Sequence, residues 1–346
     1  MTLTLVAAGL AVVSFLALAE TNVWWVRMTD FPRLQYVIAS AVLLVALVIA
    51  KPVATRVRVA LAAIALAALS FNAVKLAPYL APTEGTAAAC PVEQAFSIVL
   101  ANVQMENRNT DELLEIVRQQ EPDLFLALET NEFWDRNLSP LSDTMPETAS
   151  HIDEDYYGMH VFSRLPLRAT QILFPAEGNT PSIRTTIELP SGDDVAFVGL
   201  HPRPPHPRQS SAGRDAELMW TALRARDAGA PVVLAGDLNA VPWERSVART
   251  QRIAQLVDPR RDTGLLPTYN AKSWWMAWPL DQVLYQPGLD LVSMEVLRGF
   301  GSDHYPVEVT LCHRSSERSP PTLRPGDIEE AETSMETARR ENTGED

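Results

Sequence analysis

The chain has 346 residues, with 29 basic and 43 acidic side chains, a net charge of −14, and hydrophobic residues at 47% of its positions. This composition excludes a wholly disordered chain, because apolar side chains are plentiful. Its two cysteines are too few for a disulfide-rich scaffold or a cysteine-based zinc site. Length alone predicts about two domains of roughly 150 residues each.

The charge is spread unevenly along the chain. Residues 1–80 have a net charge of +4, residues 81–312 of −14, and residues 313–346 of −4. Sequence-independent binding of nucleic acid needs clustered Lys and Arg side chains that neutralise phosphates. The acidic central region therefore disfavours avid, non-specific binding of DNA.

Three uncharged apolar runs lie in the first eighty residues, and we expect transmembrane helices over about residues 3–19, 34–50 and 59–76. Each run is near the lower length limit for a spanning helix, and Asn72 makes the third run the weakest. Two alternatives remain open. The runs could be buried helices of a soluble protein, although they lack a polar face, or the first could be a signal peptide that ends at Ala19.

Basic residues between the predicted helices set the expected orientation. The 51–58 loop carries Lys51, Arg56 and Arg58 and no acidic residue, whereas the 20–33 loop carries two basic residues. Because cytoplasmic loops are enriched in Lys and Arg, we expect the 51–58 loop in the cytoplasm. The expected location is therefore the cell (inner) membrane, as a multi-pass protein whose remaining chain lies outside the cytoplasm.

After the membrane anchor, predicted over residues 1–80, we expect a linker over 81–90, a folded domain over 91–312 and a disordered acidic tail over 313–346. Apolar strand-like runs dominate the folded domain and helical patterns are few, which predicts an α/β sandwich of two packed sheets. The expected helices are 111–120 and 214–226, and the expected strands are 96–103, 124–128, 160–163, 183–189, 195–200, 232–235, 281–285, 291–297 and 306–311.

Cys90 and Cys312 bracket the folded domain, just before its first expected strand and at the end of its last. A disulfide between them is allowed outside the cytoplasm. Closing a loop of this size would stabilise the fold by up to about 5 kcal/mol in the chain-entropy view. Two buried free thiols are the alternative.

Polar side chains stand at the ends of several expected strands, where they could share one edge. They are Asn102, Glu129, His201, Asp237, Asn239, Asp281, Asp303 and His304. One such residue is unremarkable, but together they supply four carboxylates, two imidazoles and two carboxamides. This set suits hydrolysis of a phosphate ester, because carboxylates bind a hard cation such as Mg²⁺ and can deprotonate an attacking water. The cation would neutralise charge on the phosphoryl oxygens.

The order of these motifs resembles the endonuclease/exonuclease/phosphatase superfamily, which includes pancreatic deoxyribonuclease, apurinic endonucleases, neutral sphingomyelinases and inositol polyphosphate 5-phosphatases. The matching segments are 98–102, 122–129, 198–201, 234–239, 280–284 and 301–306, with a Pro-Thr-aromatic element at 267–269. The resemblance implies a four-layer α/β sandwich, with two packed mixed sheets flanked by helices. Its first and last strands would lie close together, which favours pairing of Cys90 with Cys312.

The resemblance also implies a role for each strand-end residue. Glu129 would be the principal ligand of Mg²⁺ or Mn²⁺, with Asn102 beside it and Asp303 near the metal. Asp237 would position the attacking water, and Asn239 would hold the phosphate. His304 would contact the phosphate while Asp281 holds its other nitrogen, and His201 would protonate or stabilise the leaving oxygen.

Three features outside these motifs bear on the substrate. Arg203, with His206 and Arg208, could form a basic rim for a second phosphate, or the segment could be a Pro-rich surface loop. Trp275 lies in a segment with three tryptophans, which could contact lipid, stack on a base or pack beneath the site. Arg184 could point toward the phosphate or be an exposed strand residue.

We therefore expect a membrane-anchored, metal-dependent phosphoesterase acting on phosphodiesters or phosphomonoesters, with a nuclease as one possibility. The alternative is a phosphohydrolase for phospholipid, sphingomyelin or inositol-phosphate headgroups at the membrane surface. A non-catalytic binding module on the same fold is the alternative of another class. The expected partners are the phosphate-ester substrate and the membrane, and no protein partner can be inferred.

Overall fold

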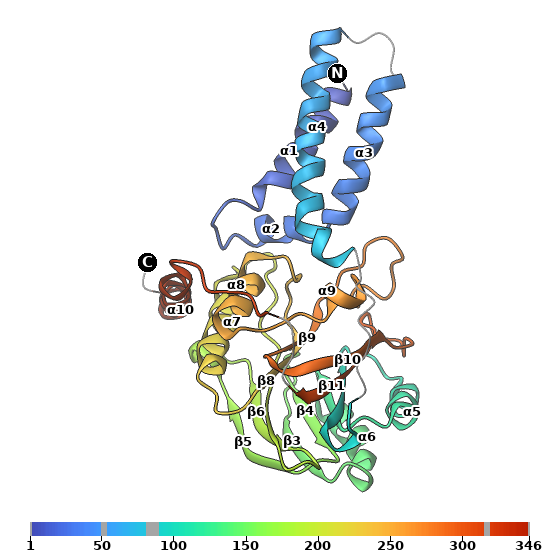
Figure 1. The fold of residues 1–346 in the computed structure, drawn as a ribbon, viewed down its shortest axis with the longest axis vertical. Coiled ribbons are helices and arrows are strands. Elements are labelled where there is room, and N and C mark those ends of the chain that lie inside the picture. Colours follow the sequence, from blue (N-terminus) through green and yellow to red (C-terminus); the bar gives the residue numbers. More distant parts are fainter. Residues whose placement is uncertain (1, 50–53, 81–89, 315–318, 345–346) are drawn as a thin grey trace. The chain divides into compact units, whose positions relative to one another are not determined.

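The structure is a computed structural model that describes residues 2–49, 54–80, 90–314 and 319–344 (Figure 1). It divides into two compact units, Met1–Pro82 with Pro205–Ser211, and Thr83–Pro204 with Ala212–Asp346. The first residues of the predicted cytoplasmic loop (51–53) and nearly all of the predicted linker (81–89) lie outside the described residues.

Apolar helices build the N-terminal unit. They are α1 (Thr2–Leu16), α3 (Arg33–Ile49) and α4 (Thr55–Leu76), with the short α2 (Trp24–Arg27) before α3. Among the described residues, one helix is long and apolar enough to cross a membrane, Thr55–Tyr79, with 25 residues and a mean hydropathy of 2.0. A second span would need Trp24–Asp30 and Arg33–Ile49 to act together across a 68° bend.

Three spans are therefore not supported: only the third predicted helix, over 59–76, falls within a helix that is long and apolar enough. The helix in the first run ends at Leu16, which leaves it short of a bilayer-spanning length. The second run is preceded by a bend rather than extended by a continuous helix.

A buried polar network lies among these apolar helices. Arg33 donates from Nη1 to Oδ1 of Asn72 at 2.6 Å and from Nε to Oδ1 of Asp30 at 2.9 Å. Asn72 in turn donates from Nδ2 to Oγ of Ser14 at 2.9 Å. Asn72, which weakens the third apolar run on hydropathy grounds, is thus satisfied by partners from α1 and α3.

Two mixed sheets form the second unit, as the sequence predicts. The strands are β1 (Ala95–Asn102), β2 (Leu124–Leu128), β3 (Glu147–His151), β4 (Met159–Ser163), β5 (Leu167–Leu173), β6 (Ser182–Glu188), β7 (Asp194–Leu200), β8 (Val232–Asp237), β9 (Asp281–Tyr285), β10 (Gly288–Val296) and β11 (Val307–Arg314). One sheet has the order β10-β11-β1-β2-β4-β3 and the other β5-β6-β7-β8-β9. The pairs β1–β2 and β7–β8 are parallel, and the remaining pairs are antiparallel.

Helices cover the outer faces of both sheets (Figure 1). They are α5 (Thr110–Gln120), α6 (Glu132–Leu138), α7 (Ala212–Arg226) and α8 (Arg245–Ala254). The short α9 (Arg260–Thr263) follows α8, and α10 (Asp327–Thr343) packs against α7. The main core lies between the sheets and contains Phe96, Leu126, Phe197 and Val283. Separate clusters pack α5 and α6 against the first sheet and α7 and α8 against the second. This is the expected sandwich of two mixed sheets flanked by helices.

The expected strands all occur, with shifts of a few residues at their ends, but two strands were not predicted. β3 and β5 pair at the outer edges of their sheets, and their side chains are mostly exposed. An edge strand with polar, exposed positions lacks the apolar run that marks a buried strand.

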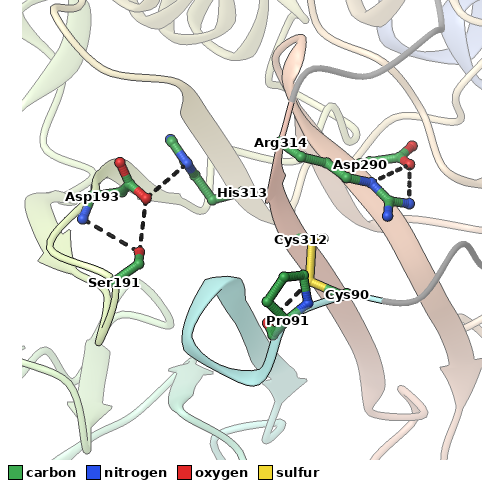
Figure 2. The surroundings of a disulfide bond; sticks show 8 residues. All are labelled: Cys90, Pro91, Ser191, Asp193, Asp290, Cys312, His313 and Arg314. Atoms are coloured by element: carbon green, nitrogen blue, oxygen red, sulfur yellow. Dashed lines mark hydrogen bonds and ion pairs between the residues drawn. A yellow bond between two sulfur atoms is a disulfide. The ribbon is translucent and has the colours of Figure 1, made fainter.

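Cys90 and Cys312 are joined by a disulfide (Figure 2), with Cα atoms 5.9 Å apart and 222 residues between them in sequence. The described chain therefore has no free thiol. Cys312 is in β11, which pairs antiparallel with β1, and Ala95 lies opposite Cys312 in that pairing. The disulfide therefore links the segment before the first strand to the last strand, which is paired with the first.

The expectation of a disordered tail over 313–346 is wrong for part of this segment. Strand β11 continues to Arg314, and α10 occupies Asp327–Thr343. Ile328, Ala331, Met335 and Ala338 follow one another at three- and four-residue intervals and pack against the α7 and α8 side of the fold. The helical period of this segment is weak in the sequence, because only four small or medium apolar residues carry it among many charged ones.

Candidate active site

The first sheet places Asn102 and Glu129 side by side. Strands β1 and β2 are parallel, with Asn102 opposite Leu128, so the residues at their carboxyl ends lie at one edge. Asn102 donates from Nδ2 to Oε1 of Glu129 at 2.8 Å. Glu129 has a φ of +62°, and its Oε2 accepts the backbone N–H of Met105 at 3.3 Å.

The second sheet places His201, Asp237 and Asp281 at a common edge. Asp237 ends β8 and lies opposite Asp281, the first residue of β9, while His201 follows β7 directly. Gly236 has a φ of +158°, and a Cβ atom there would lie 1.7 Å from the carbonyl oxygen of Leu200. Only glycine therefore allows the ends of β7 and β8 to approach so closely.

The two edges meet through Asn102, His201 and Asp237. Nδ2 of Asn102 also lies 3.2 Å from Oδ2 of Asp237. Nε2 of His201 is 4.0 Å from Oε1 of Glu129 and 3.8 Å from Oδ2 of Asp237. The polar residues that are far apart in sequence thus gather in one buried cluster.

His304 joins this cluster from the segment before β11. Its Nδ1 lies 2.7 Å from Oδ2 of Asp281, and its Nε2 lies 3.6 Å from Oδ2 of Asp237. Ser302 holds the segment in place, because its hydroxyl donates to the carbonyl oxygen of Asn102 at 2.8 Å and accepts the backbone N–H of His304 at 3.0 Å.

Burial and neighbouring charges shift the pKa values of these groups in different directions. Burial is the main cause that raises the pKa of Glu129 and of Asp237. Burial also opposes the charged form of Asp281, but the charge and hydrogen bond of His304 outweigh it and lower the pKa of Asp281. Burial would likewise lower the pKa of His304, but Asp281 and Asp237 raise it to about 10. Asp281 and His304 therefore form a charged, hydrogen-bonded pair.

The donor set fits a divalent cation. Ligand atoms of Asp237, Asp281 and His304 all lie within 4.8 Å of one another, but Asp281 and the charged His304 engage each other through Oδ2 and Nδ1, which leaves the carboxylates of Asp237 and Glu129 for a cation. Glu129 and Asp237 bring two carboxylates to the same amide, Asn102 Nδ2. A hard cation prefers such oxygen ligands, and its charge would offset the burial of two carboxylates. Asp303 is half-buried in the next position, and its backbone N–H donates to the side chain of Gln104 at 3.1 Å.

The N–H groups of Asn239 donate hydrogen bonds within the protein. Its Nδ2 donates to the carbonyl oxygen of Pro202 at 3.0 Å, and its backbone N–H donates to Oδ1 of Asp237 at 2.9 Å. The fully buried Arg214 donates from Nη1 to the carbonyl oxygen of Asn239 at 2.8 Å. Asn239 thus links Asp237 to the segment that follows His201.

Sequence reasoning missed the residues that hold the site from behind. Arg214 and Arg260 are fully buried, and Nη2 of Arg260 donates to the carbonyl oxygen of Asp281. Thr268 accepts the backbone N–H of Asp281 at 3.2 Å, and the ring of Tyr269 lies 4.8 Å from that of His304. The Pro-Thr-aromatic element at 267–269 was the only available signal, and nothing in the sequence marked the two arginines.

Arg184 does not reach the cluster, which corrects its assignment to the phosphate. Its neighbour Ile183 belongs to the core between the sheets, so Arg184 points to the opposite, helix-covered face. There it lines a hollow together with Trp220 and Arg224. The alternation of side chains along β6 decides its direction, and the sequence could not tell which face is which.

The tryptophans of the 273–278 segment differ in their surroundings. The ring of Trp278 lies 6.2 Å from that of Tyr269, which packs on His304. Trp274 is 95% exposed and Trp275 is 58% exposed. The loop that carries them is joined to the site, because the backbone N–H of Ala271 donates to the carbonyl oxygen of Asp303 at 2.7 Å.

Comparison with known proteins agrees with this architecture. The model of the "Endonuclease/Exonuclease/phosphatase family" matches residues 99–304. A search of curated proteins finds no match.

Several solved structures share the fold. TDP2 of D. rerio, complexed with a single-strand DNA product, has a TM-score of 0.55 at 16% identity and covers 63% of this chain and 98% of its own. The endonuclease/exonuclease/phosphatase of Beutenbergia cavernae has a TM-score of 0.52 at 19% identity, over 64% of this chain and 72% of its own. The catalytic domain of human Nocturnin, with bound sulfate, has a TM-score of 0.51 at 18% identity, over 64% of this chain and 95% of its own.

Proposed function

Because the chain belongs to the endonuclease/exonuclease/phosphatase family of hydrolases acting on phosphoric esters, we propose that it is a membrane-anchored, metal-dependent phosphoesterase. Its reaction would be hydrolysis of a phosphodiester or phosphomonoester by an activated water. The observation that carries this proposal is the convergence of Glu129, Asp237 and His304 around Asn102 and Asp281, from strands of both sheets.

Glu129 is the proposed principal ligand of Mg²⁺ or Mn²⁺, with Asn102 beside it and Asp303 nearby. Such a cation neutralises charge that develops on the phosphoryl oxygens. The support for this assignment is the oxygen-rich donor set around Asn102 and the raised pKa values of two buried carboxyl groups, which a neighbouring cation would offset.

Each remaining residue has a proposed role that its position supports. Asp237 orients the attacking water and accepts its proton. His304, held at Nδ1 by Asp281, presents Nε2–H to the phosphate. His201, whose Nδ1 has no hydrogen-bond partner among the described residues, serves the leaving oxygen through Nε2. Asn239 holds the carboxylate of Asp237 and the segment after His201 in a fixed position relative to each other, because it donates hydrogen bonds to both.

A nuclease is the first substrate class that we propose, because D. rerio TDP2 shares the fold and was captured with single-strand DNA product. Hydrolysis of a phospholipid, sphingomyelin or inositol-phosphate headgroup is the second. It is favoured by Trp274, which is 95% exposed on a loop joined to Asp303, since exposed Trp side chains suit the interface of a bilayer. The intact buried set of ionisable residues argues against a purely non-catalytic binding module.

We further propose that the N-terminal unit anchors the enzyme in the cell membrane and that the catalytic domain lies outside the cytoplasm. The apolar helix Thr55–Tyr79 supports an anchor, and the Cys90–Cys312 disulfide suits an oxidising compartment. Protease added to intact spheroplasts should degrade the catalytic domain, whereas protection of the domain until the membrane is lysed would contradict this orientation.

A substrate panel with the purified, detergent-solubilised full chain tests the proposed reaction. Plasmid DNA, RNA, phospholipid vesicles and sugar phosphates are each incubated with Mg²⁺ or Mn²⁺, and in parallel with a chelator. We expect phosphate-ester hydrolysis of at least one class that stops in the chelator. Absence of hydrolysis across the panel, in protein that is folded by circular dichroism, would contradict the proposal.

A further inference from the structure

The segment that leaves β7 after His201 is held by Asn239, which donates from Nδ2 to the carbonyl oxygen of Pro202 at 3.0 Å. The carboxyl group of Glu217 lies near the next residue, Arg203, and the two interact electrostatically. His201 and Arg203 each precede a proline, which favours an extended backbone. Two residues of extended chain place Arg203 about 6–7 Å beyond His201.

The side chain of Arg203 is available for an anion. It is half-buried, and within the described ranges its guanidinium group has no carboxylate at ion-pair distance. The carboxyl group of Glu217 is near enough to interact with its charge. Burial, however, raises the pKa of Glu217 to about 8, so at neutral pH this carboxyl group is mostly protonated and leaves the positive charge unneutralised. An arginine in this state suits phosphate, which its planar fork can bind through two hydrogen bonds.

Tyr157 lies beside His201. Its ring centroid is 5.8 Å from that of His201, with the two planes tilted by 50°. The charges of Arg203, Glu217 and Glu129 all act on its hydroxyl group. No hydrogen-bond partner of this hydroxyl occurs in the described part of the chain, so it is a donor available to a ligand.

Glu217 supports this arrangement from helix α7. It is 2% exposed, and its Oε2 atom has no hydrogen-bond partner among the described residues. A buried carboxyl group without a partner is costly to keep, and Glu217 is close enough to Arg203 to interact with its charge. It would act on a ligand only through Arg203.

We propose that Arg203 and Tyr157 form a subsite for a second phosphate group of the substrate, beside His201, and that Glu217 is the positioning residue of this subsite. The inference rests on the proposed phosphoesterase function and narrows it to substrates with two phosphate groups. Two sources share that chemistry, a nucleic-acid strand and an inositol headgroup with a ring phosphate.

Two matched substrate pairs test the subsite with the full chain in detergent and Mn²⁺. The first pair is a dinucleotide with and without a terminal phosphate, and the second is glycerophosphoinositol with and without a ring phosphate. We expect kcat/KM to be at least about tenfold higher for the doubly phosphorylated member of one pair, which identifies the source, as expected for a charge-assisted contact of about 1.4 kcal/mol. A ratio near one in both pairs, with all substrates hydrolysed, would overturn the subsite.

Variants separate the subsite from a general loss of activity, because the readout is the ratio within a pair. Arg203→Met should bring the ratio near one through KM, Arg203→Lys should keep part of it, and Tyr157→Phe should lower it. Glu217→Ala should lower the ratio and Glu217→Gln should restore it, since the amide has the size of the protonated carboxyl group and is likewise uncharged. Arg118→Met, an exposed arginine on α5, is the matched control and should change neither rate nor ratio.

Two outcomes remain distinct. An unchanged ratio in folded Arg203→Met and Arg203→Lys would overturn the subsite and leave the phosphoesterase intact. Failure of the wild-type protein to hydrolyse either pair or the wider panel would contradict the proposed function itself.

Discussion

Nδ1 of His304 lies 2.7 Å from Oδ2 of Asp281, and both side chains are buried. Asp281 is itself held by Thr268, which accepts its backbone N–H, and by Arg260, which donates to its carbonyl oxygen. With Nδ1 held in this way, Nε2 of His304 is directed toward Asp237, 3.6 Å away. The pair therefore fixes both the ring orientation and the protonation of the imidazole.

Replacement of Asp281 should damage catalysis through His304. We expect Asp281→Asn to lower kcat by about 10- to 100-fold with a smaller change in KM, because the amide cannot stabilise the imidazolium form. Steady-state kinetics on the substrate identified by the panel measure this effect. Asp143→Asn, an exposed carboxylate outside the site, is the matched control, and equal kinetics for the two variants would contradict the role of the pair.

Gly236 should not tolerate a side chain. A Cβ atom would lie 1.7 Å from the carbonyl oxygen of Leu200, and the φ of +158° is strained for any other residue. We expect Gly236→Ala to lower the free energy of unfolding by at least about 3 kcal/mol, measured by thermal unfolding. Gly229→Ala, where a Cβ atom would meet nothing within 4 Å, should change it little. Equal stability of the two variants would count against the close approach of β7 and β8.

The facing carboxylates of Glu295 and Glu308 should make stability depend on pH. They lie opposite each other in β10 and β11, and burial together with Glu295 raises the pKa of Glu308 to about 7 from its ordinary 4.5. The folded state therefore binds this proton more tightly than the unfolded state. Its contribution to stability is present below about pH 4.5 and is lost as the pH rises through 7.

Glu308→Gln should remove this dependence. We expect the melting temperature of the variant to rise relative to that of wild type as the pH increases from 4.5 to 7.5. The corresponding gain in the free energy of unfolding should be about 0.2–1 kcal/mol, which is typical of facing like charges. A difference in melting temperature between the two proteins that stays the same at every pH would show that the two carboxylates do not interact.

The Cys90–Cys312 disulfide should stabilise the catalytic domain. It closes a loop with a sequence separation of 222 residues, for which the chain-entropy view predicts up to about 5 kcal/mol. Reductant should lower the melting temperature of the wild-type protein and leave the Cys90→Ser/Cys312→Ser double variant unchanged. Mass spectrometry that finds both thiols free in protein prepared without reductant would contradict the pairing.

The sheets and the strand-end residues could be predicted because each buried strand is a short apolar run closed by a polar residue. Asn102, Glu129 and Asp237 stand at such ends, and the parallel pairs bring the ends together. The edge strands β3 and β5 lack this signal, since most of their side chains are exposed. The helix α10 shows only a weak apolar period in the sequence, because alanines such as Ala331 and Ala338 form much of its buried face.

The supporting contacts of the site could not be predicted, because they exist only in the folded chain. Arg214 reaches Asn239 across 25 residues, and Ser302 reaches Asn102 across 200. The sequence does not show which face of β6 Arg184 takes, so the choice between a phosphate contact and a strand position away from the site stayed open until the fold was known. The count of three spans is not supported either, because hydropathy does not reveal where a helix ends or bends within an apolar run.

The central claim is that Asp237 activates the water that attacks the phosphate. It is tested most directly by kcat/KM of wild type and Asp237→Asn on a chromogenic phosphodiester with Mn²⁺, with Mn²⁺ affinity and circular dichroism measured on the same samples. We predict a loss of at least about 10²-fold in the variant while its fold is retained, as expected when a general base is removed. Retention of most of the activity in a folded, metal-binding Asp237→Asn protein would contradict the account.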